Sequence, residues 1–163
     1  FLPYLAGERC PHNDPHARGG WIGLTQRHGA AHLVRSVMEG ITFGLNDSLK
    51  LMREMGMPVE AVYASGGAVR SALWRQMLAD VFGVPVITTN AVESGAFGAA
   101  LLAASGTGAF ANVTEASDRW IAEAGRTEPR SGQAYVAAYE VYRGLHGKLK
   151  DTFASLAEMG QEA

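Results

Sequence analysis

Several features are scarce in this chain of 163 residues, and each scarcity excludes a class of protein. A single cysteine rules out an internal disulfide framework and fits a reducing compartment. The formal net charge of −2 gives no basic surplus to attract nucleic acid or an anionic membrane surface. No run of about 18 apolar residues would cross a bilayer, and no basic segment leads into a secretory signal. We therefore expect a cytoplasmic protein with no nucleic acid and no membrane as partners.

The remaining composition is typical of a folded protein, except that its glycine content is unusually high. The chain is 47% hydrophobic and 18% charged, which is typical of a globular domain. It contains 20 glycines, well above the usual share of about 7%. The chain begins at Phe1 without a methionine, and we expect it to be a piece of a longer protein.

The sequence predicts an irregular arm over residues 1–20 and two long helices, one in the first third of the chain and one near its end. Apolar residues at spacings of three and four form one stripe, and they are Leu33, Val37, Ile41, Leu45, Leu49 and Met52. This pattern predicts a helix over residues 30–55, in which Gly40 and Gly44 share a face and let another backbone approach closely. A second helix is predicted over residues 133–159, with the stripe Tyr135, Tyr139, Tyr142, Leu149, Phe153 and Leu156. Its three tyrosines are expected in the core, with an oligomer surface as the alternative.

Between these helices, the pattern predicts an α/β layer. We expect strands at 61–64 and 84–88, helices at 71–82, 94–105 and 113–120, and a loop at 121–132. Strands that alternate with helices favour parallel pairing. We expect residues 1–163 to form one compact unit.

The turn from Ser65 to Ser71 is the first candidate site. It follows a predicted strand and precedes a helix, which is where α/β sheets hold ligands. Gly66 and Gly67 would let the backbone lie against a flat ligand, and the helix N-terminus offers free N–H groups. A tight turn without a ligand is the alternative. The spacing is neither a dinucleotide-binding fingerprint nor a phosphate-binding loop with Gly-Lys-Ser/Thr.

A second segment is more specific. Residues 19–24, Gly-Gly-Trp-Ile-Gly-Leu, are followed after seven residues by residues 32–39, His-Leu-Val-Arg-Ser-Val-Met-Glu. Every specified position of the second signature of the FGGY carbohydrate kinases is met, so the chain resembles that family. The arm over residues 4–19 is similar to the same region of xylulokinases. The segments 65–74, 83–86 and 93–100 resemble the family's adenosine-binding half.

The resemblance implies an ATP-dependent sugar kinase, a phosphotransferase that uses ATP and Mg²⁺. It implies an α/β fold, the second domain of a ribonuclease-H-like (actin-like ATPase) pair, incomplete at its N-terminal side. Residues 1–163 would be the nucleotide-binding C-terminal portion, with the sugar-binding N-terminal domain absent. Gly66 and Gly67 would contact the adenosine, and the Ser71 hydroxyl would hydrogen-bond the base.

The parent enzyme would convert D-xylulose to D-xylulose 5-phosphate. Because the family's catalytic aspartate lies in the other domain, no catalytic residue is assigned here and the chain alone should be inactive. Kinases for gluconate, ribulose, fuculose or glycerol are alternatives, as is a non-catalytic nucleotide-binding or interaction module. A homodimer stays open.

The arm also holds polar residues with weaker claims. Cys10, His12 and His16 match no zinc spacing, and we expect no metal site. Glu8 and Asp14 would be solvated turn residues or, as the alternative, would approach the substrate. In the helix that follows, His32 is expected to pack or cap the helix start.

Overall fold

The computed structural model describes residues 1–91 and 94–159 of the chain. The helices and strands are α1 (Ala30–Glu54), β1 (Val62–Tyr63), the 3₁₀ turn η1 (Ala68–Arg70), α2 (Ala72–Phe82), β2 (Val86–Thr89), α3 (Ser94–Gly106), α4 (Val113–Trp120), β3 (Glu123–Thr127) and α5 (Gln133–Met159). All five predicted helices are confirmed, with ends within about two residues of the expected ones.

The described chain divides into two compact units, and the expectation of one unit is wrong. Unit 1 combines Phe1–Pro58 with Ser131–Ala163, and unit 2 is the continuous segment Val59–Arg130. The chain passes from one unit to the other near Pro58 and Pro129, at loop segments that carry no helix or strand. Local periodicity reports helices and strands but not which of them share a core, so it could not reveal this division.

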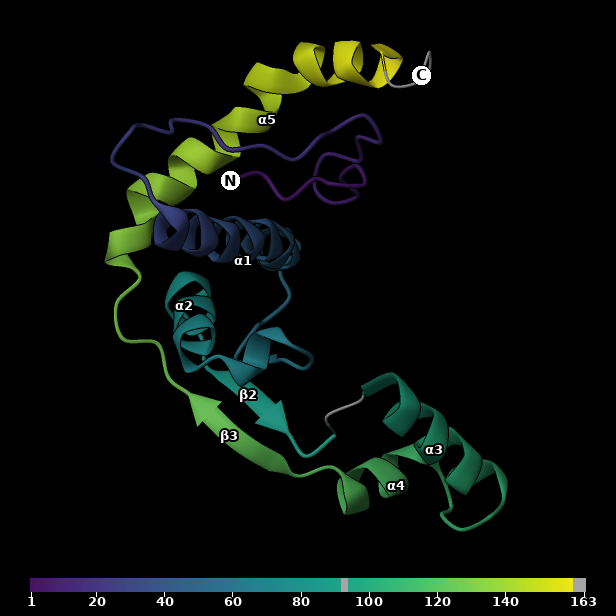
Figure 1. Ribbon diagram of the computed structural model, residues 1–163. Helices are drawn as coiled ribbons and strands as arrows, with labels where there is room; N and C mark the ends of the chain where they lie inside the picture. Colours follow the sequence, from purple (N-terminus) through teal and green to yellow (C-terminus); the bar gives the residue numbers. More distant parts are fainter. Residues whose placement is uncertain (92–93, 160–163) are drawn as a thin grey trace. The chain divides into compact units, whose positions relative to one another are not determined.

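Unit 1 is built from the arm, α1 and α5 (Figure 1). The buried face of α1 shares only Leu49 with the predicted aliphatic stripe, since Leu45 and Met52 are 52% and 44% exposed. The buried residues of this helix are Gly40, Thr42, Phe43, Asn46, Asp47 and Leu49. Phe43 packs against the rings of Tyr139 and Tyr142, with centroids 5.4 and 5.5 Å apart. Tyr139 and Tyr142 of α5 therefore lie in the core, as expected, and they pack against a partly polar face of α1.

Gly40 is where the arm approaches α1 most closely. A Cβ at this position would lie 2.2 Å from the carbonyl oxygen of Phe1, a distance that no real Cβ adopts. A Cβ on Gly44 would lie 3.1 Å from the hydroxyl of Tyr142. The predicted role of both glycines in close packing is confirmed, and at Gly40 the neighbour is the backbone of the arm.

Unit 2 contains a mixed three-stranded sheet in the order β1-β2-β3. The parallel pairing of β1 and β2 is confirmed, with Val62 opposite Val86. The sequence prediction of a loop at 121–132 is wrong in part, because β3 pairs antiparallel to β2 there. Its residues, Glu-Ala-Gly-Arg-Thr, are almost all exposed and lack apolar alternation, as an edge strand can.

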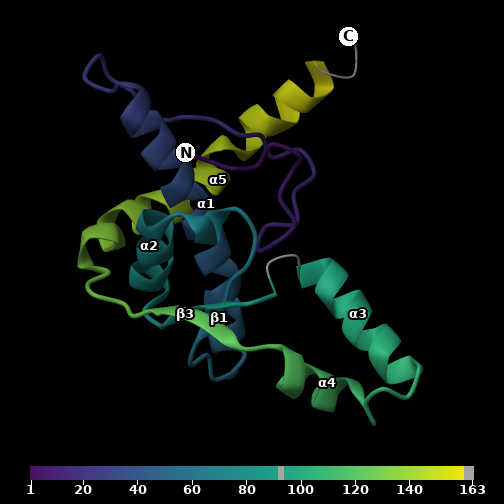
Figure 2. The ribbon, with the colours of Figure 1, turned by 60° about the horizontal axis from the view of Figure 1, so that its bottom comes forward.

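Helix α2 lies between β1 and β2 in the chain, and its buried residues are Met77, Leu78, Ala79 and Phe82. It ends at Gly83 in the left-handed conformation, with φ +67°, as a C-terminal glycine commonly does. Figure 2 shows α3 and α4 beside one another in the same unit. The sheet and α2 are what position the glycine turn.

Candidate nucleotide-binding turn and its surroundings

The glycine turn lies at the carboxyl end of β1, where the sequence placed it. The Ala64 amide still donates to the Ile87 carbonyl at 2.9 Å, so the sheet fixes the start of the turn. Gly66 then adopts φ +85°, a conformation that favours glycine. Both Gly66 and Gly67 are exposed, and apart from each glycine and its chain neighbours no described atom lies within 4 Å of the position a Cβ would take on either. The two glycines thus present open backbone that a flat ligand can contact.

Ser71 joins this turn to α2 as its N-cap. Its hydroxyl accepts a hydrogen bond from the Trp74 amide at 3.3 Å. A serine hydroxyl has two acceptor lone pairs and one donor hydrogen. The cap uses one lone pair, so the O–H donor of Ser71 stays available for a ligand at the turn. Capping is a second role for Ser71 that is independent of ligand binding.

The turn between Gly67 and Ser71 is closed by η1 and by an arginine. The amides of Arg70 and Ser71 donate to the carbonyls of Gly67 and Ala68, both at 3.2 Å. The Arg75 side chain, one turn into α2, donates to the carbonyl of Val69. From Ser65 to Ser71 the segment carries one cation, Arg70, and no carboxylate. An anionic ligand therefore meets no like charge within the turn.

The described residues contain no group of three or more His, Cys, Asp or Glu side chains that could hold a metal ion. Magnesium carried by a nucleotide keeps several waters and binds phosphate oxygens, with one or two carboxylates from the protein. Since the turn segment has no carboxylate, we assign no Mg²⁺ ligand in this chain. Glu93, within the segment that resembles the adenosine-binding half, lies outside the described residues.

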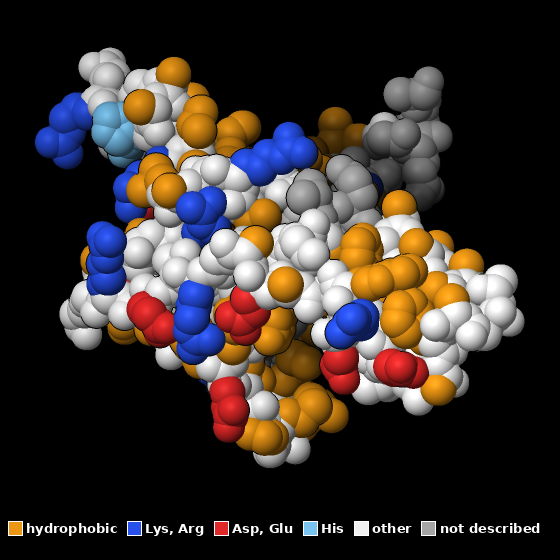
Figure 3. All heavy atoms as spheres, turned by 90° about the horizontal axis from the view of Figure 1, so that it is seen from below, with side chains coloured by type: hydrophobic (Ala, Val, Ile, Leu, Met, Phe, Trp, Pro, Cys, Tyr) orange, Lys and Arg blue, Asp and Glu red, His pale blue; other side chains and the backbone are white. Residues whose placement is uncertain are grey.

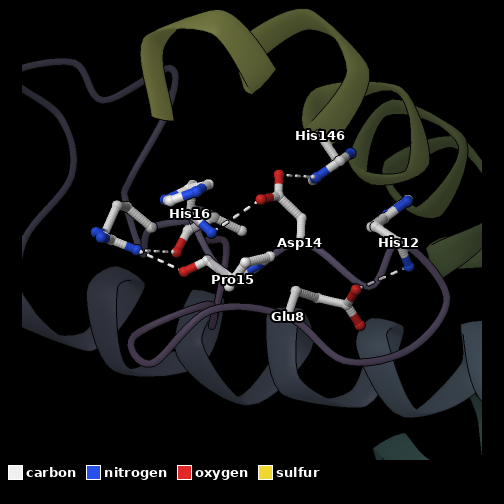
Figure 4. A network of polar contacts seen from close by, with 8 residues as sticks. Glu8, His12, Asp14, Pro15, His16 and His146 are labelled. Atoms are coloured by element: carbon white, nitrogen blue, oxygen red, sulfur yellow. Dashed lines mark hydrogen bonds and ion pairs between the residues drawn. The ribbon is translucent and has the colours of Figure 1, made fainter. Parts of the chain in front are cut away.

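The polar residues of the arm form a network with α5 (Figure 4). A ring nitrogen of His146 lies 2.9 Å from an Asp14 oxygen, and the His16 amide donates to the other oxygen at 2.9 Å. The rings of His12 and His146 are stacked, with centroids 3.8 Å apart and planes 2° from parallel. Glu8 accepts a hydrogen bond from the His12 amide at 2.8 Å. These groups tie the arm to α5.

Burial and these contacts shift the pKa values in unit 1. Burial lowers the pKa of His12, and the neighbouring His146 lowers it further. Burial alone would raise the pKa of Asp14, but hydrogen bonds from His146 and from the His16 amide lower it on balance. Burial raises the pKa of Asp47, and the hydrogen bond from Tyr139 at 2.6 Å offsets this only in part.

His146 and Asp47 were not singled out from the sequence as partners of the arm or of α5. Asp14 and His146 are 132 residues apart in the chain, and no local pattern connects them. His32 does act as predicted, because its ring accepts a hydrogen bond from the Gly29 amide at 3.2 Å at the start of α1. The two halves of the signature also meet, since the Trp21 indole donates to the Ser36 hydroxyl at 3.1 Å.

Comparison with known proteins decides the family. Residues 1–107 match the family described as "FGGY family of carbohydrate kinases, C-terminal domain". The chain belongs to the FGGY family. Its resemblance to that family in the arm, the signature and the glycine turn is thereby confirmed.

Individual FGGY proteins extend this likeness over nearly the whole chain. A xylulose kinase of Bacillus subtilis is 39% identical over 158 residues, which cover 96% of this chain and 32% of the relative. A gluconokinase of the same species is 34% identical over 161 residues, covering 97% and 31%. The crystal structure of ligand-bound xylulose kinase from Lactobacillus acidophilus superposes with a TM-score of 0.81 at 31% identity, covering 95% and 32%. The chain thus spans about a third of the length of its FGGY relatives.

The surface of this FGGY chain adds two observations. None of the helices within the described residues is long and apolar enough to cross a membrane. The face drawn in Figure 3 exposes hydrophobic, basic and acidic side chains.

Proposed function

We propose that this chain is the nucleotide-binding C-terminal part of an ATP-dependent kinase that converts D-xylulose to D-xylulose 5-phosphate. The observation that carries the proposal is the open glycine turn at the carboxyl end of β1 in a chain of the FGGY family. Gly66 and Gly67 would face the adenosine, and the free O–H of Ser71 would donate to the base. We also propose that the fold belongs to the ribonuclease-H-like class.

ATP would supply the phosphoryl group, with Mg²⁺ bound to its phosphates. Phosphoryl transfer depends on positioning and on the stabilisation of charge. The residues of this chain would contribute positioning, since they would hold the base and ribose of the nucleotide. The sugar and the base that accepts its proton would be held by the N-terminal domain, so we expect the 163-residue chain alone to be inactive. We place the enzyme in the cytoplasm and leave homodimerisation as a proposal for the full-length protein.

Gluconate is the second candidate substrate, because a gluconokinase matches the chain over a similar span at 34% identity. The full-length protein should be assayed with D-xylulose, gluconate, ribulose, fuculose and glycerol at equal concentrations. We expect the highest kcat/KM with D-xylulose. A higher value with any other sugar would reject the substrate, while no phosphorylation of any of them would favour a non-catalytic nucleotide-binding module.

The nucleotide site has its own test. In the full-length enzyme, Gly67→Val should place a branched side chain where the adenosine would lie and raise the KM for ATP at least tenfold, leaving the KM for sugar unchanged. Gly147→Val is the matched control, because no described atom lies near that position in α5 either. An unchanged KM for ATP in a folded Gly67→Val enzyme would remove Gly67 from the site.

A further inference from the structure

A cavity of about 590 Å³ in unit 2 lies beside α2 and has no role in the function proposed above. One wall is the first two turns of α2, and the other is the chain from Arg126 to Arg130. The walls are tied together by hydrogen bonds. The Gln76 amide donates to the Glu128 carbonyl at 3.0 Å, and the Arg130 amide donates to Asp80 at 2.7 Å. The cavity therefore has a defined shape.

Three arginines line this cavity, namely Arg75, Arg126 and Arg130, together with the carboxylate of Glu128, and the Asp80 carboxylate lies at the same wall, where it accepts a hydrogen bond from the Arg130 amide. Glu128 lies 2.6 Å from Arg126 and offsets one of the three positive charges. Arg75 uses one donor on the Val69 carbonyl, and a guanidinium has five. Among the described residues, no carboxylate lies within 4 Å of the guanidinium of Arg75 or of Arg130. The lining thus keeps positive charge and N–H donors that the protein itself does not use.

The backbone adds donors to the same wall. Ala72 and Leu73 line the cavity and form the first turn of α2, whose early amides have no partner within the helix. The Ser71 cap accepts from the Trp74 amide and leaves the two preceding amides free. The N-terminal end of a helix also carries partial positive charge. Side chains and backbone on this wall therefore favour the same kind of ligand.

We propose that this cavity binds a phosphate group, held by Arg130, by the free donors of Arg75 and by the first amides of α2. Arginine forks match the paired oxygens of a phosphate, and a dianion suits a lining with excess positive charge. The volume accommodates an organic group attached to the phosphate. The phosphate either comes free from solution or belongs to a nucleotide whose base lies at Gly66 and Gly67. The proposal stands on the cavity itself, so it does not depend on kinase activity.

The test is a titration of the isotopically labelled 163-residue chain, followed by amide NMR at constant ionic strength. Inorganic phosphate should shift the Ala72 and Leu73 amides at millimolar concentration. The variant Arg130→Gln, which removes one of the proposed phosphate ligands, should bind at least tenfold more weakly. Arg119→Gln is the matched control, because Arg119 is an exposed arginine of the same unit that does not line this cavity.

Parallel titrations with AMP and adenosine identify the source of the phosphate. If the cavity takes the phosphate of a nucleotide, AMP should bind more tightly than phosphate and shift Gly66, Gly67 and Ala72 together. If it takes free phosphate, both ligands should shift Ala72 and Leu73 with equal affinity. Absence of phosphate-induced shifts, or an equal loss in Arg119→Gln, would reject the phosphate site. In that case adenosine-induced shifts at Gly66 would leave the proposed nucleotide function intact.

Discussion

The two units differ in how completely their polar groups are engaged. In unit 1, buried polar side chains pair across long sequence distances, as Tyr139 does with Asp47 and Tyr4 with Tyr142, although the Asn46 Oδ1 has no partner among the described residues. In unit 2, the turn at Gly66 and the cavity at Arg130 carry donors and open backbone with few protein partners. Groups that the fold leaves unengaged are available to a ligand. Both of the ligand sites that we propose therefore lie in unit 2.

The largest effect on stability should come from removing Phe43, the aromatic residue at the centre of unit 1. Phe43 is 4% exposed and lies among three tyrosine rings. Phe43→Ala should lower the free energy of unfolding by about 3–5 kcal/mol, because it leaves a cavity in the core. Urea unfolding followed by far-UV circular dichroism measures this loss. Leu45→Ala is the control, since Leu45 on the same helix is 52% exposed and should change stability by no more than about 0.5 kcal/mol.

The second largest effect should come from Gly40. Gly40→Ala places a methyl group against the Phe1 carbonyl, which should cost about 1–3 kcal/mol through displacement of the arm. Gly147→Ala makes the same change in α5, where no described atom lies within 4 Å, and should stabilise the protein by about 0.5–1 kcal/mol. Thermal unfolding of both variants should give shifts of opposite sign. Shifts of the same sign would contradict the close approach of the arm.

Ser71 sharpens the comparison because it caps α2 and, in the function that we propose, also contacts the ligand. Ser71→Ala removes the cap of α2 and should cost about 1 kcal/mol of stability, whereas Ser71→Asn keeps a capping oxygen and should cost little. The nucleotide titration separates the two roles. If the hydroxyl also contacts the base, Ser71→Asn should weaken adenosine binding although its stability is preserved.

The smallest expected effect is a dependence of stability on pH. The folded state lowers the pKa of His12, so the unfolded chain binds more protons below pH 6.5, the group's ordinary pKa. Stability should therefore fall as the pH drops through this value. The groups that face His12 are Glu8, Asp14, Asp47 and His146. The lowered pKa of Asp14 adds a second loss at more acidic pH, below 3.8.

Urea unfolding at several pH values between about 7 and 5 measures this slope. The variant His12→Gln should flatten it in that range, because glutamine does not titrate. His28→Gln, at an exposed histidine outside the network, should leave the slope unchanged. A slope that survives His12→Gln would assign the dependence to another group.

Much of the fold could be predicted from the sequence because its signals are local. Helix periodicity, Gly83 at the end of α2 and the glycine turn after β1 are each set by neighbouring residues. Strand β3 could not be predicted, since its exposed residues carry no apolar alternation and its pairing with Val86 is a tertiary contact. The partly polar face of α1 could not be predicted for a similar reason, because the groups that pair with the buried Asp47, Tyr139 and Arg143, lie in α5, and Tyr139 is 92 residues away.

The residues of the candidate sites also fall into those that local sequence predicts and those that only the tertiary structure brings together. Gly66, Gly67 and Ser71 could be located because a strand, a turn and a helix follow one another in the chain. The arginines around the α2 cavity could not, since Arg75 and Arg130 are brought together only when β3 pairs with β2. The Asp14–His146 pair escaped prediction because each residue alone resembles an ordinary polar residue of a loop or helix.

The discontinuous make-up of unit 1 has a consequence for synthesis on the ribosome. Unit 2 is one uninterrupted segment, so all of its partners have emerged once Arg130 has left the exit tunnel. Phe43 and Asp47 must wait until α5 is translated, because their partners Tyr139 and Tyr142 lie there. A nascent chain stalled before residue 133 would therefore expose Phe43 and the rest of the α1 face that α5 covers, although unit 2 is already complete, and we expect this stage to be the one most prone to misfolding.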